Sequence, residues 1–323
     1  MSSKITLANG KQFDAIEGKS ILESARLSGL VLEYGCSNGQ CGVCACTLIS
    51  GEVNNLNDSF HSPEEKNLNR ILTCQSIPIS DVIIDIADLG IYENYPAKTM
   101  PARISSIEKI GKGILKLTLR TPPTSKLNFL PGQFLDLIHG SLRRSYSIAN
   151  AQRSDGSFDL IIKKVEGEKM SEILFNQTKE NDLFRVEGPL GTFGWREDIK
   201  KNVIFMVTGT GIAPALSMFS VIKGNEESIL LIWVNRFVSE FFEIYLPKNV
   251  TIKKVLSRED KKYFYRGYVQ DVLLSSEIDL SDVTVFACGS ESMIRDSKEK
   301  LVKHGLENRH FYSDAYVSSG KQL

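Results

Sequence analysis

The sequence predicts a multidomain chain of α+β and α/β architecture, and three patterns support this prediction. Five of the six cysteines lie between Cys36 and Cys74, in a segment that also has a short helical pattern. Short β-rich runs separated by turn residues recur from Ala102 to Arg196, as in an antiparallel barrel. From Lys201 onward, strands alternate with a glycine turn and helices, as in a doubly wound parallel sheet. At 323 residues the chain has room for three domains, whose predicted limits are 1–94, 98–198 and 199–323.

Composition and charge exclude several classes of protein. Hydrophobic residues make up 42% of the chain and charged residues 24%, which is ordinary for a globular protein. The 39 basic and 39 acidic side chains cancel, so the chain has no basic excess for nucleic acid. The longest apolar runs, residues 203–207 and 229–234, are too short to cross a bilayer, so no integral membrane association is expected. The first residues lack the apolar stretch of a signal peptide, which predicts a cytoplasmic location.

In the N-terminal domain, the alternation at residues 4–7 and the apolar run at residues 81–86 both predict strands. Between them, Ser20 and Glu23 have the spacing of a capping box and open a predicted helix. Residues 87–101 contain two prolines and no clear periodicity, which predicts an interdomain linker.

Four cysteines of this domain, Cys36, Cys41, Cys44 and Cys74, have the spacing C-x4-C-x2-C with a fourth cysteine about thirty residues on. A reducing compartment keeps thiols free, so such crowding indicates metal. The spacing fits a 2Fe-2S cluster, whose two irons need four thiolates. A structural zinc site or buried free thiols are the alternatives, although only one C-x2-C pair is present. Cys46 is expected in the core, and ligation by Cys46 in place of Cys44 is the less favoured arrangement.

This segment resembles plant-type ferredoxin domains over nearly its whole length, including the approach at residues 33–36 and the return at residues 72–75. The resemblance implies a β-grasp fold and a cluster that transfers one electron at a time. Gly35, Gly39 and Gly42 are expected to let backbone N–H groups point at the sulfur atoms.

Elements of the two later domains follow from the same patterns. In the middle domain, strands are predicted at residues 114–119, 134–138, 145–148, 158–165 and 183–187, with one helix at 171–177. In the C-terminal domain, strands are predicted at 203–207, 229–234, 251–256 and 283–287, with a helix at 213–222.

Arg144, Tyr146 and Ser147 form an R-x-Y-S motif that follows P-G-Q-F at residues 131–134. Together they resemble the flavin-binding signature of the ferredoxin–NADP reductase superfamily. The resemblance implies that Arg144 pairs with the FAD pyrophosphate, that Tyr146 packs against the isoalloxazine and that Ser147 hydrogen-bonds near N5. Without the neighbouring motifs, the same residues describe an ordinary strand with an exposed arginine and a buried tyrosine.

A second phosphate contact is expected at Ser171, which opens the predicted helix, because helix N-termini present free N–H groups. The superfamily usually has glycine three residues before this serine, whereas Glu168 occupies that place here, next to Gly167. Lys163 matches a basic position of the superfamily, and a solvated strand lysine is the equal alternative.

Gly209, Thr210 and Gly211 form a turn between the strand at 203–207 and the helix that contains Pro214. A strand, glycine turn and helix cradle phosphate groups. The turn departs from G-x-G-x-x-G because Pro214 replaces the third glycine, and the acid expected about twenty residues on is absent. It resembles instead the G-T-G-x-A-P turn of the same reductase superfamily.

Three further stretches resemble that superfamily. Residues 188–193 match its G-P-x-G-x-F element, and Cys288 with Gly289 matches its C-G turn, which implies a cysteine close to the nicotinamide. Tyr316 resembles tail residues that place an aromatic ring on the flavin. A buried strand-end cysteine and an aromatic strand in the core are the corresponding structural alternatives.

The nucleotide preference depends on Arg236, Ser257 and Arg258. These residues could hold a 2′-phosphate and favour NADPH, contact the ribose, or face solvent. NADH is the preferred prediction, because the reductases that the chain resembles use it.

The order of the three domains resembles one-chain iron-sulfur flavoenzyme reductases that serve oxygenases or deoxysugar dehydrases. The implied cofactors are one 2Fe-2S cluster, FAD and NADH or NADPH. Hydride brings two electrons and the cluster accepts one, so the flavin must divide them. The electrons then leave to a partner protein, because the four histidines show no metal spacing and no G-x-S-x-G nucleophile occurs.

The identity of the electron acceptor is the least specific part of the resemblance. Residues 48–53, 143–151 and 311–317 are similar to reductases that serve CDP-4-keto-6-deoxyglucose 3-dehydrase in 3,6-dideoxyhexose biosynthesis. A reductase component of an aromatic-ring mono- or dioxygenase is the alternative. A redox-sensing binding protein is a third hypothesis, disfavoured because a sensor has no need of a complete hydride path.

Overall fold

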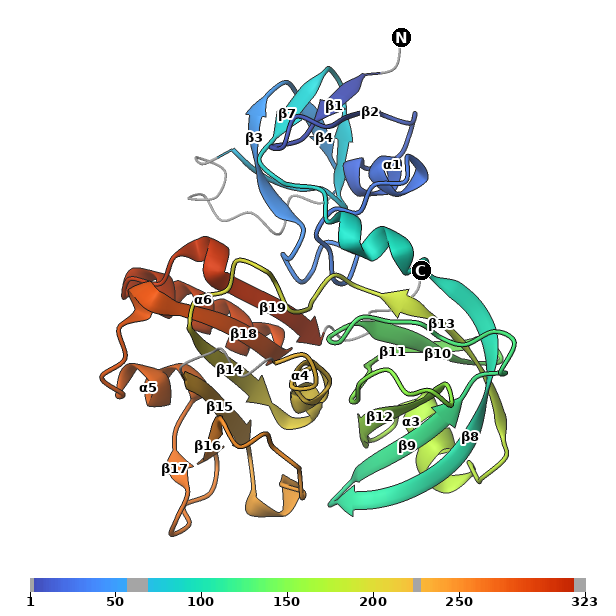
Figure 1. Ribbon diagram of the computed structural model, residues 1–323, viewed down its shortest axis with the longest axis vertical. Coiled ribbons are helices and arrows are strands. Elements are labelled where there is room, and N and C mark those ends of the chain that lie inside the picture. Colours follow the sequence, from blue (N-terminus) through green and yellow to red (C-terminus); the bar gives the residue numbers. More distant parts are fainter. Residues whose placement is uncertain (1–2, 57–68, 223–227, 317–323) are drawn as a thin grey trace. The chain divides into compact units, whose positions relative to one another are not determined.

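The computed structural model describes residues 3–56, 69–222 and 228–316, and it divides into two compact units, Met1–Pro96 and Ala97–Leu323 (Figure 1). None of the helices in these described ranges is long and apolar enough to span a membrane.

The N-terminal unit has a mixed five-stranded sheet of order β2-β1-β7-β3-β5, in which only β1 and β7 are parallel, beside the β4–β6 pair. Helix α1 (Ile21–Leu27) begins at Ser20, whose hydroxyl accepts the N–H of Glu23, as the capping pattern predicted. Ile21 and Leu22 of the helix pack into the core of this unit. The strands are β1 Lys4–Thr6, β2 Gln12–Asp14, β3 Ala45–Ser50, β4 Val53–Asn55, β5 Arg70–Leu72, β6 Ser76–Pro78 and β7 Val82–Ile84. The fold is the predicted β-grasp.

The first part of the second unit is an antiparallel barrel of order β11-β10-β13-β8-β9-β12. An antiparallel bridge between Ile148 and Leu160 joins the end of β11 to β12 and so links the two outer strands. Helix α3 (Lys169–Asn176) follows β12, and its Met170 and Leu174 are buried in the barrel core. The strands are β8 Lys98–Gly111, β9 Ile114–Arg120, β10 Phe134–His139, β11 Leu142–Ser147, β12 Ser157–Lys163 and β13 Leu183–Leu190.

The rest of the second unit is a six-stranded parallel sheet of order β17-β16-β15-β14-β18-β19. Helices α5 (Val269–Leu274) and α6 (Glu291–Lys303) pack in the core on one face, and α4 (Ile212–Met218) packs in the core on the other. This is the predicted doubly wound arrangement. The strands are β14 Asn202–Thr208, β15 Ser228–Asn235, β16 Val250–Leu256, β17 Tyr265–Arg266, β18 Val283–Ser290 and β19 Phe311–Tyr316.

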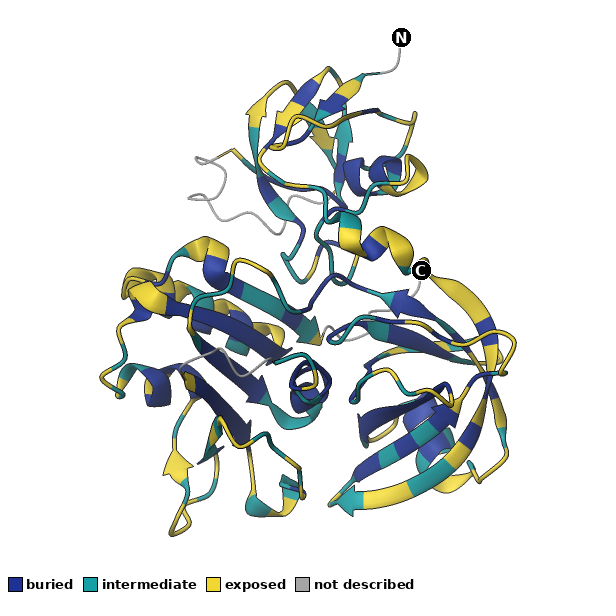
Figure 2. Cartoon of the chain, viewed as in Figure 1, coloured by how far each residue is buried: buried dark blue, intermediate teal, exposed yellow. Residues whose placement is uncertain are grey.

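The barrel and the parallel sheet share one hydrophobic core. Ile114, Ile161 and Phe193 of the barrel segment pack in the same cluster as Phe205 and Phe286 of the sheet. Because both faces of the sheet are covered, its central strands β14, β15 and β18 are buried along nearly their whole length (Figure 2). This shared burial explains why the two lobes form a single unit.

The linker predicted at residues 87–101 is wrong in part. Gly90–Asn94 forms a short 3-10 helix, and Lys98 already begins β8. Met100 and Ala102 point inward along β8, but Pro101 between them conceals the alternation in the sequence. The helix predicted at 213–222 is also shorter, because α4 ends at Met218.

Candidate functional site

The four predicted cluster ligands lie in the N-terminal unit as two pairs. The backbone N–H of Cys36 donates to Sγ of Cys41, and the N–H of Cys41 donates to Sγ of Cys36, both at 3.3 Å. The Sγ atoms of Cys44 and Cys74 lie 3.2 Å apart. Two irons that each take two protein thiolates need two such pairs, so this donor set fits a 2Fe-2S cluster.

The two thiols of each pair also differ in acidity. Hydrogen bonding from its neighbour lowers the pKa of one thiol in each pair, Cys36 and Cys74. Each pair therefore has one thiol that is favoured as a thiolate, the form that binds iron.

Cys46 lies in the core rather than with the ligands. It pairs with Ile71 across β3 and β5 and is 3% exposed. Burial raises the pKa of its thiol to about 12, so the side chain is a neutral, apolar group.

The loop around the cysteines is closed by Gln75, which the sequence analysis did not select. Its amide Nε2 lies 3.8 Å from Sγ of Cys74. Gly39 has a φ of +84°, and a Cβ there would lie 2.8 Å from Cγ of Gln75. The glycine thus allows the loop to turn and the glutamine to pack over it.

In the second unit, the predicted flavin contacts converge from β11 and the start of α3. The Arg144 guanidinium lies 2.7 Å from the carboxylate of Glu168. Glu168 also caps α3 by accepting the N–H groups of Met170 and Ser171. The hydroxyl of Ser171 accepts the N–H of Val165 at 2.9 Å. A guanidinium and the N–H groups at a helix start are the donors that a diphosphate prefers, so this donor set, which Glu168 engages in this structure, fits FAD.

Tyr146 lies next to these donors on β11, partly buried against the barrel core. Burial raises the pKa of its phenol, and the negative charge of Glu168 adds to this effect. Lys163 does not join the donors, because its ammonium pairs with Glu240 at 2.7 Å. Lys163 as a cofactor contact stays a prediction.

The glycine turn at residues 209–211 lies against the carboxyl end of β18. A Cβ at Gly211 would lie 2.4 Å from the carbonyl oxygen of Cys288, so only glycine allows this approach. The indole N–H of Trp233 donates to the carbonyl of Gly209 at 3.0 Å and fixes the turn from β15. Pro214 lies in the first turn of α4, where its missing N–H costs nothing.

A buried polar cluster joins the ends of β11, β18 and β19. The hydroxyl of Ser147 donates to Asp314 at 3.4 Å, and Sγ of Cys288 lies 3.9 Å from the same carboxylate oxygen. The hydroxyl of Tyr316 donates to the carbonyl of Thr210 at 3.0 Å. The structure therefore brings the predicted residues Ser147, Cys288 and Tyr316 together.

Asp314 is the member of this cluster that the sequence analysis missed. It is 7% exposed and lies opposite Cys288 in the parallel pairing of β18 with β19. The sequence contained one indication of this position. Asp314 lies two residues before Tyr316, and alternate residues of a strand lie on the same face. Burial raises the pKa of the Cys288 thiol, and the charge of Asp314 raises it further, so this cysteine is neutral.

The predicted nucleotide-specificity residues follow the carboxyl ends of β15 and β16. The N–H of Arg236 donates to Glu240 at 2.9 Å, and Ser257 and Arg258 donate to the backbone of residues 235 and 236. Asn235 precedes them, buried, and its amide has no hydrogen-bond partner among the described residues. Ligands of parallel sheets bind at this edge, so Asn235 is a further candidate contact for the nucleotide. A cavity lined by Asn202 and Ser228 lies at the opposite edge of the sheet, where β14 and β15 begin.

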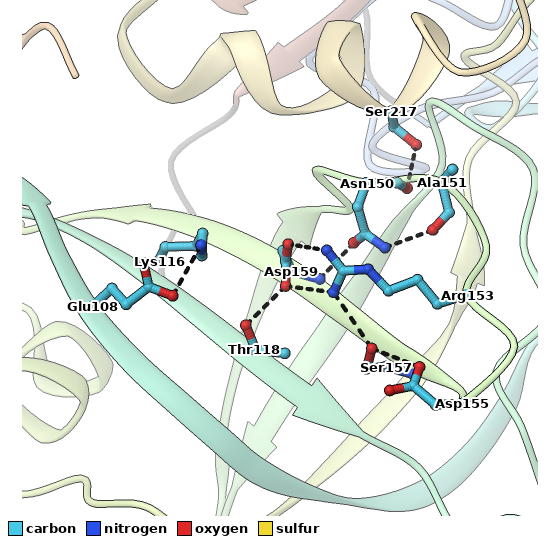
Figure 3. A network of polar contacts seen from close by, with 10 residues as sticks. All are labelled: Glu108, Lys116, Thr118, Asn150, Ala151, Arg153, Asp155, Ser157, Asp159 and Ser217. Carbon is cyan, nitrogen blue, oxygen red and sulfur yellow. Dashed lines mark hydrogen bonds and ion pairs between the residues drawn. The ribbon is translucent and has the colours of Figure 1, made fainter. Parts of the chain in front are cut away.

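A polar network connects the segment after the flavin motif to α4 of the nucleotide lobe (Figure 3). Ser217 of α4 donates to the carbonyl of Asn150 at 2.7 Å, and the side chain of Asn150 accepts the N–H of Asp159. Arg153 forms two hydrogen bonds with the carboxylate of Asp159, at 2.9 and 2.6 Å. The segment after the R-x-Y-S motif is thus held between the barrel and α4.

The fold and these sites define an iron-sulfur flavoprotein that oxidises a reduced nicotinamide nucleotide. Three family models match the chain in this order: the 2Fe-2S iron-sulfur cluster binding domain at residues 5–78, the oxidoreductase FAD-binding domain at residues 101–195 and the oxidoreductase NAD-binding domain at residues 205–299. The cofactor predictions are therefore confirmed.

Curated relatives match the chain along nearly its whole length. It is 38% identical over 309 residues to CDP-6-deoxy-L-threo-D-glycero-4-hexulose-3-dehydrase reductase of Yersinia pestis, which covers 93% of this chain and 94% of the relative. It is 28% identical to the toluate 1,2-dioxygenase electron transfer component of Pseudomonas putida over 95% of both chains. The chain belongs to the family of CDP-6-deoxyhexulose 3-dehydrase reductases, which confirms the preferred resemblance.

Solved structures support the fold. The Amycolatopsis cytochrome P450 reductase GcoB has a TM-score of 0.74 at 21% identity and covers 98% of this chain and 99% of its own. The ferredoxin reductase in carbazole 1,9a-dioxygenase has a TM-score of 0.69 at 24% identity, with the same coverage.

Proposed function

We propose that this reductase takes electrons from NADH and supplies them to a 3-dehydrase that acts on a CDP-linked 4-keto-6-deoxyhexose, in 3,6-dideoxyhexose biosynthesis. The supporting observation is the 38% identity to the Yersinia pestis dehydrase reductase, which extends over both units of the chain. The partner belongs to the proposal because this chain contains only the electron donor.

Each proposed residue role in the flavin lobe follows from its contacts. FAD, when bound, would supply a hydride acceptor whose electrons can leave one at a time. Arg144 and the N–H groups of α3 would hold its phosphates, and Tyr146 would pack on its ring. Ser147, whose hydroxyl donates to Asp314 in this structure, would lie near N5, the atom that accepts the hydride. Asp314 would orient this hydroxyl and would accept the N5 proton when the reduced flavin gives up its electrons.

The nucleotide lobe would position the other reactant. Gly209, Thr210 and Gly211 would receive its phosphates at the start of α4. Cys288 would lie beside the nicotinamide as a neutral packing group, because burial keeps its thiol protonated. Tyr316 would cover the flavin until the nucleotide arrives. In the other unit, Cys36, Cys41, Cys44 and Cys74 would hold the cluster.

A reductase of an aromatic-ring dioxygenase is the second candidate. The 28% identity to the toluate 1,2-dioxygenase component supports it, since this match also spans the whole chain. The higher identity to the dehydrase reductase favours the first candidate.

A reconstituted assay distinguishes the two candidates. The purified reductase and NADH are mixed anaerobically with the 3-dehydrase and its CDP-4-keto-6-deoxyhexose substrate, and NADH oxidation is recorded. We expect oxidation that requires both the dehydrase and its substrate. Turnover with toluate dioxygenase and toluate, but none with the dehydrase, would reject the first candidate in favour of the second.

We also propose the domain limits 1–94, 98–198 and 199–323 and a cytoplasmic location.

A further inference from the structure

Two elements that are suited to bind phosphate meet on one carboxylate of this chain. Arg144 approaches Oε1 of Glu168 at 2.7 Å from β11. The N–H groups of Met170 and Ser171 donate to the same carboxylate, at 3.1 and 2.6 Å. The Glu168 side chain is only 22% exposed. Glu168 therefore engages the Arg144 guanidinium and two of the N–H groups that are proposed above for the FAD diphosphate.

A carboxylate and a phosphate compete for the same donors. Both are anions with oxygens that accept charge-assisted hydrogen bonds from a guanidinium, and both are favoured at a helix N-terminus. Helix α3 offers few N–H groups at its start, so the carboxylate and the diphosphate exclude one another there. A residue without a side chain at this position would leave the donors open.

We propose that Glu168 is an internal competitor of the flavin diphosphate, so that FAD binds only when this carboxylate leaves Arg144 and the start of α3. Glu168 thereby sets the affinity for FAD and favours release of the flavin. The inference rests on the proposed flavin site. It predicts that the effect is confined to flavins that carry phosphate.

The movement requires little rearrangement of the backbone. Glu168 follows Gly167, which has a φ of +73° and open space around the position of a Cβ. Helix α3 is anchored by Met170 and Leu174, which are buried in the barrel core, in addition to its cap at Glu168.

The test measures flavin affinity of the full-length protein with its cluster intact and its flavin removed. Titration calorimetry and quenching of flavin fluorescence give the Kd for FAD and for riboflavin, which lacks phosphate. Glu168→Ser keeps an N-cap oxygen but is too short to reach Arg144. Glu168→Gln keeps the length and removes the charge. Glu166→Gln, at a side chain that is 92% exposed in the same loop, is the matched control.

We expect Glu168→Ser and Glu168→Gln to bind FAD about tenfold more tightly than the parent, with riboflavin affinity unchanged, since both variants remove the competing negative charge and only a phosphate gains from its loss. Glu166→Gln should match the parent for both ligands. Unchanged or weaker FAD binding by Glu168→Ser, with parental circular dichroism, would overturn the inference.

A further variant separates this inference from the proposed site. Arg144→Gln should weaken FAD binding and leave riboflavin binding unchanged. If Arg144→Gln binds FAD as the parent does, the proposed flavin site is wrong. If it weakens FAD binding while the Glu168 variants have no effect, the site holds and the competition does not.

Discussion

At the scale of single residues, protonation distinguishes the groups around the proposed hydride path. An ordinary thiol or phenol already keeps its proton at neutral pH, and burial raises the pKa of the Cys288 thiol further. Asp314 is the carboxylate that contacts Ser147 and Cys288. It is therefore the group best placed to accept or hold a proton beside the flavin.

Asp314→Asn tests this role. The amide keeps the size of the side chain and removes its ability to hold a proton. We expect reoxidation of the reduced flavin, in which the flavin N5–H gives up its proton, to slow about 10²-fold, the lower end of what a positioned acid or base contributes. Anaerobic stopped-flow absorbance measures this rate. The exposed Asp296→Asn on α6 is the control, and an unchanged rate for Asp314→Asn would remove Asp314 from the mechanism.

A sequence can identify site residues that lie close together along the chain. Cys36, Cys41 and Cys44 share one loop, and Arg144, Tyr146 and Ser147 share one strand, so their spacing is visible. Asp314 acquires its role from the pairing of β19 with β18 and from the approach of β11, which lies 167 residues earlier at Ser147. No local pattern records such contacts. The ion pair between Arg144 and Glu168 likewise depends on how β11 and the start of α3 pack, so the sequence does not reveal it.

At the scale of elements, the barrel strands were largely predictable and β8 was not. Apolar runs such as β12 and β14 are evident in the sequence because their residues are buried. In β8 the proline and the exposed half of the strand obscure the period of two. Residues 57–68 lie outside the described residues, and so does position 317, the last residue of the stretch 311–317 that is similar to the dehydrase reductases.

Arg143 joins three barrel strands and gives the fold a pH dependence. From β11 it contacts Asp136 on β10 and Glu187 on β13, at 2.9 and 2.8 Å. Hydrogen bonding from Arg143 lowers the pKa of Glu187 below its ordinary value of 4.5. A carboxyl group whose pKa is lower in the folded state stabilises the protein above the unfolded pKa, and this contribution is lost as the pH falls through the folded value.

Arg143→Gln should therefore lower the free energy of unfolding at pH 7 by about 0.5 to 1 kcal/mol, since the pair is partly exposed. The difference from the parent should shrink as the pH falls below about 4. Urea unfolding at pH 7 and at pH 3.5 measures both quantities, with the exposed Arg103→Gln as control. A difference that grows on acidification would contradict this explanation.

The glycine turn gives a prediction about packing. Gly211→Ala would place a Cβ 2.4 Å from the carbonyl of Cys288 and push the turn away from β18. We expect a loss of stability of about 1 to 3 kcal/mol and a marked rise in the KM for NADH. Gly111→Ala, where the nearest atom would be 3.4 Å away, is the control in the same unit. Parental KM and stability in Gly211→Ala would show that the turn tolerates a side chain.

At the scale of the whole molecule, the net charge of zero is the sum of opposite net charges on the two units. Residues 1–96 contain 12 acidic and 6 basic side chains, a net charge of −6, whereas residues 97–323 contain 27 acidic and 33 basic ones, a net charge of +6. Electrons leave through the cluster in the acidic unit. An acceptor with a basic docking surface is therefore attracted to the correct end of the chain.

Salt should screen this attraction. With cytochrome c, a basic protein, as acceptor, we expect the NADH-dependent reduction rate at low acceptor concentration to fall about tenfold between 10 mM and 0.5 M salt. Flavin reduction at saturating NADH occurs within the complex and should change little. A cytochrome c rate that is independent of salt would show that the acidic unit does not steer its acceptor.

The central claim is that one chain converts hydride from NADH into single electrons by way of FAD and a 2Fe-2S cluster. The most direct test is an anaerobic titration of the purified protein with NADH and, in parallel, NADPH, recorded by absorbance. FAD takes two electrons and the cluster one, so we predict that both bands bleach completely at about 1.5 equivalents of NADH. A titration that ends at one equivalent, with the flavin bleached and the cluster still oxidised, would contradict the account.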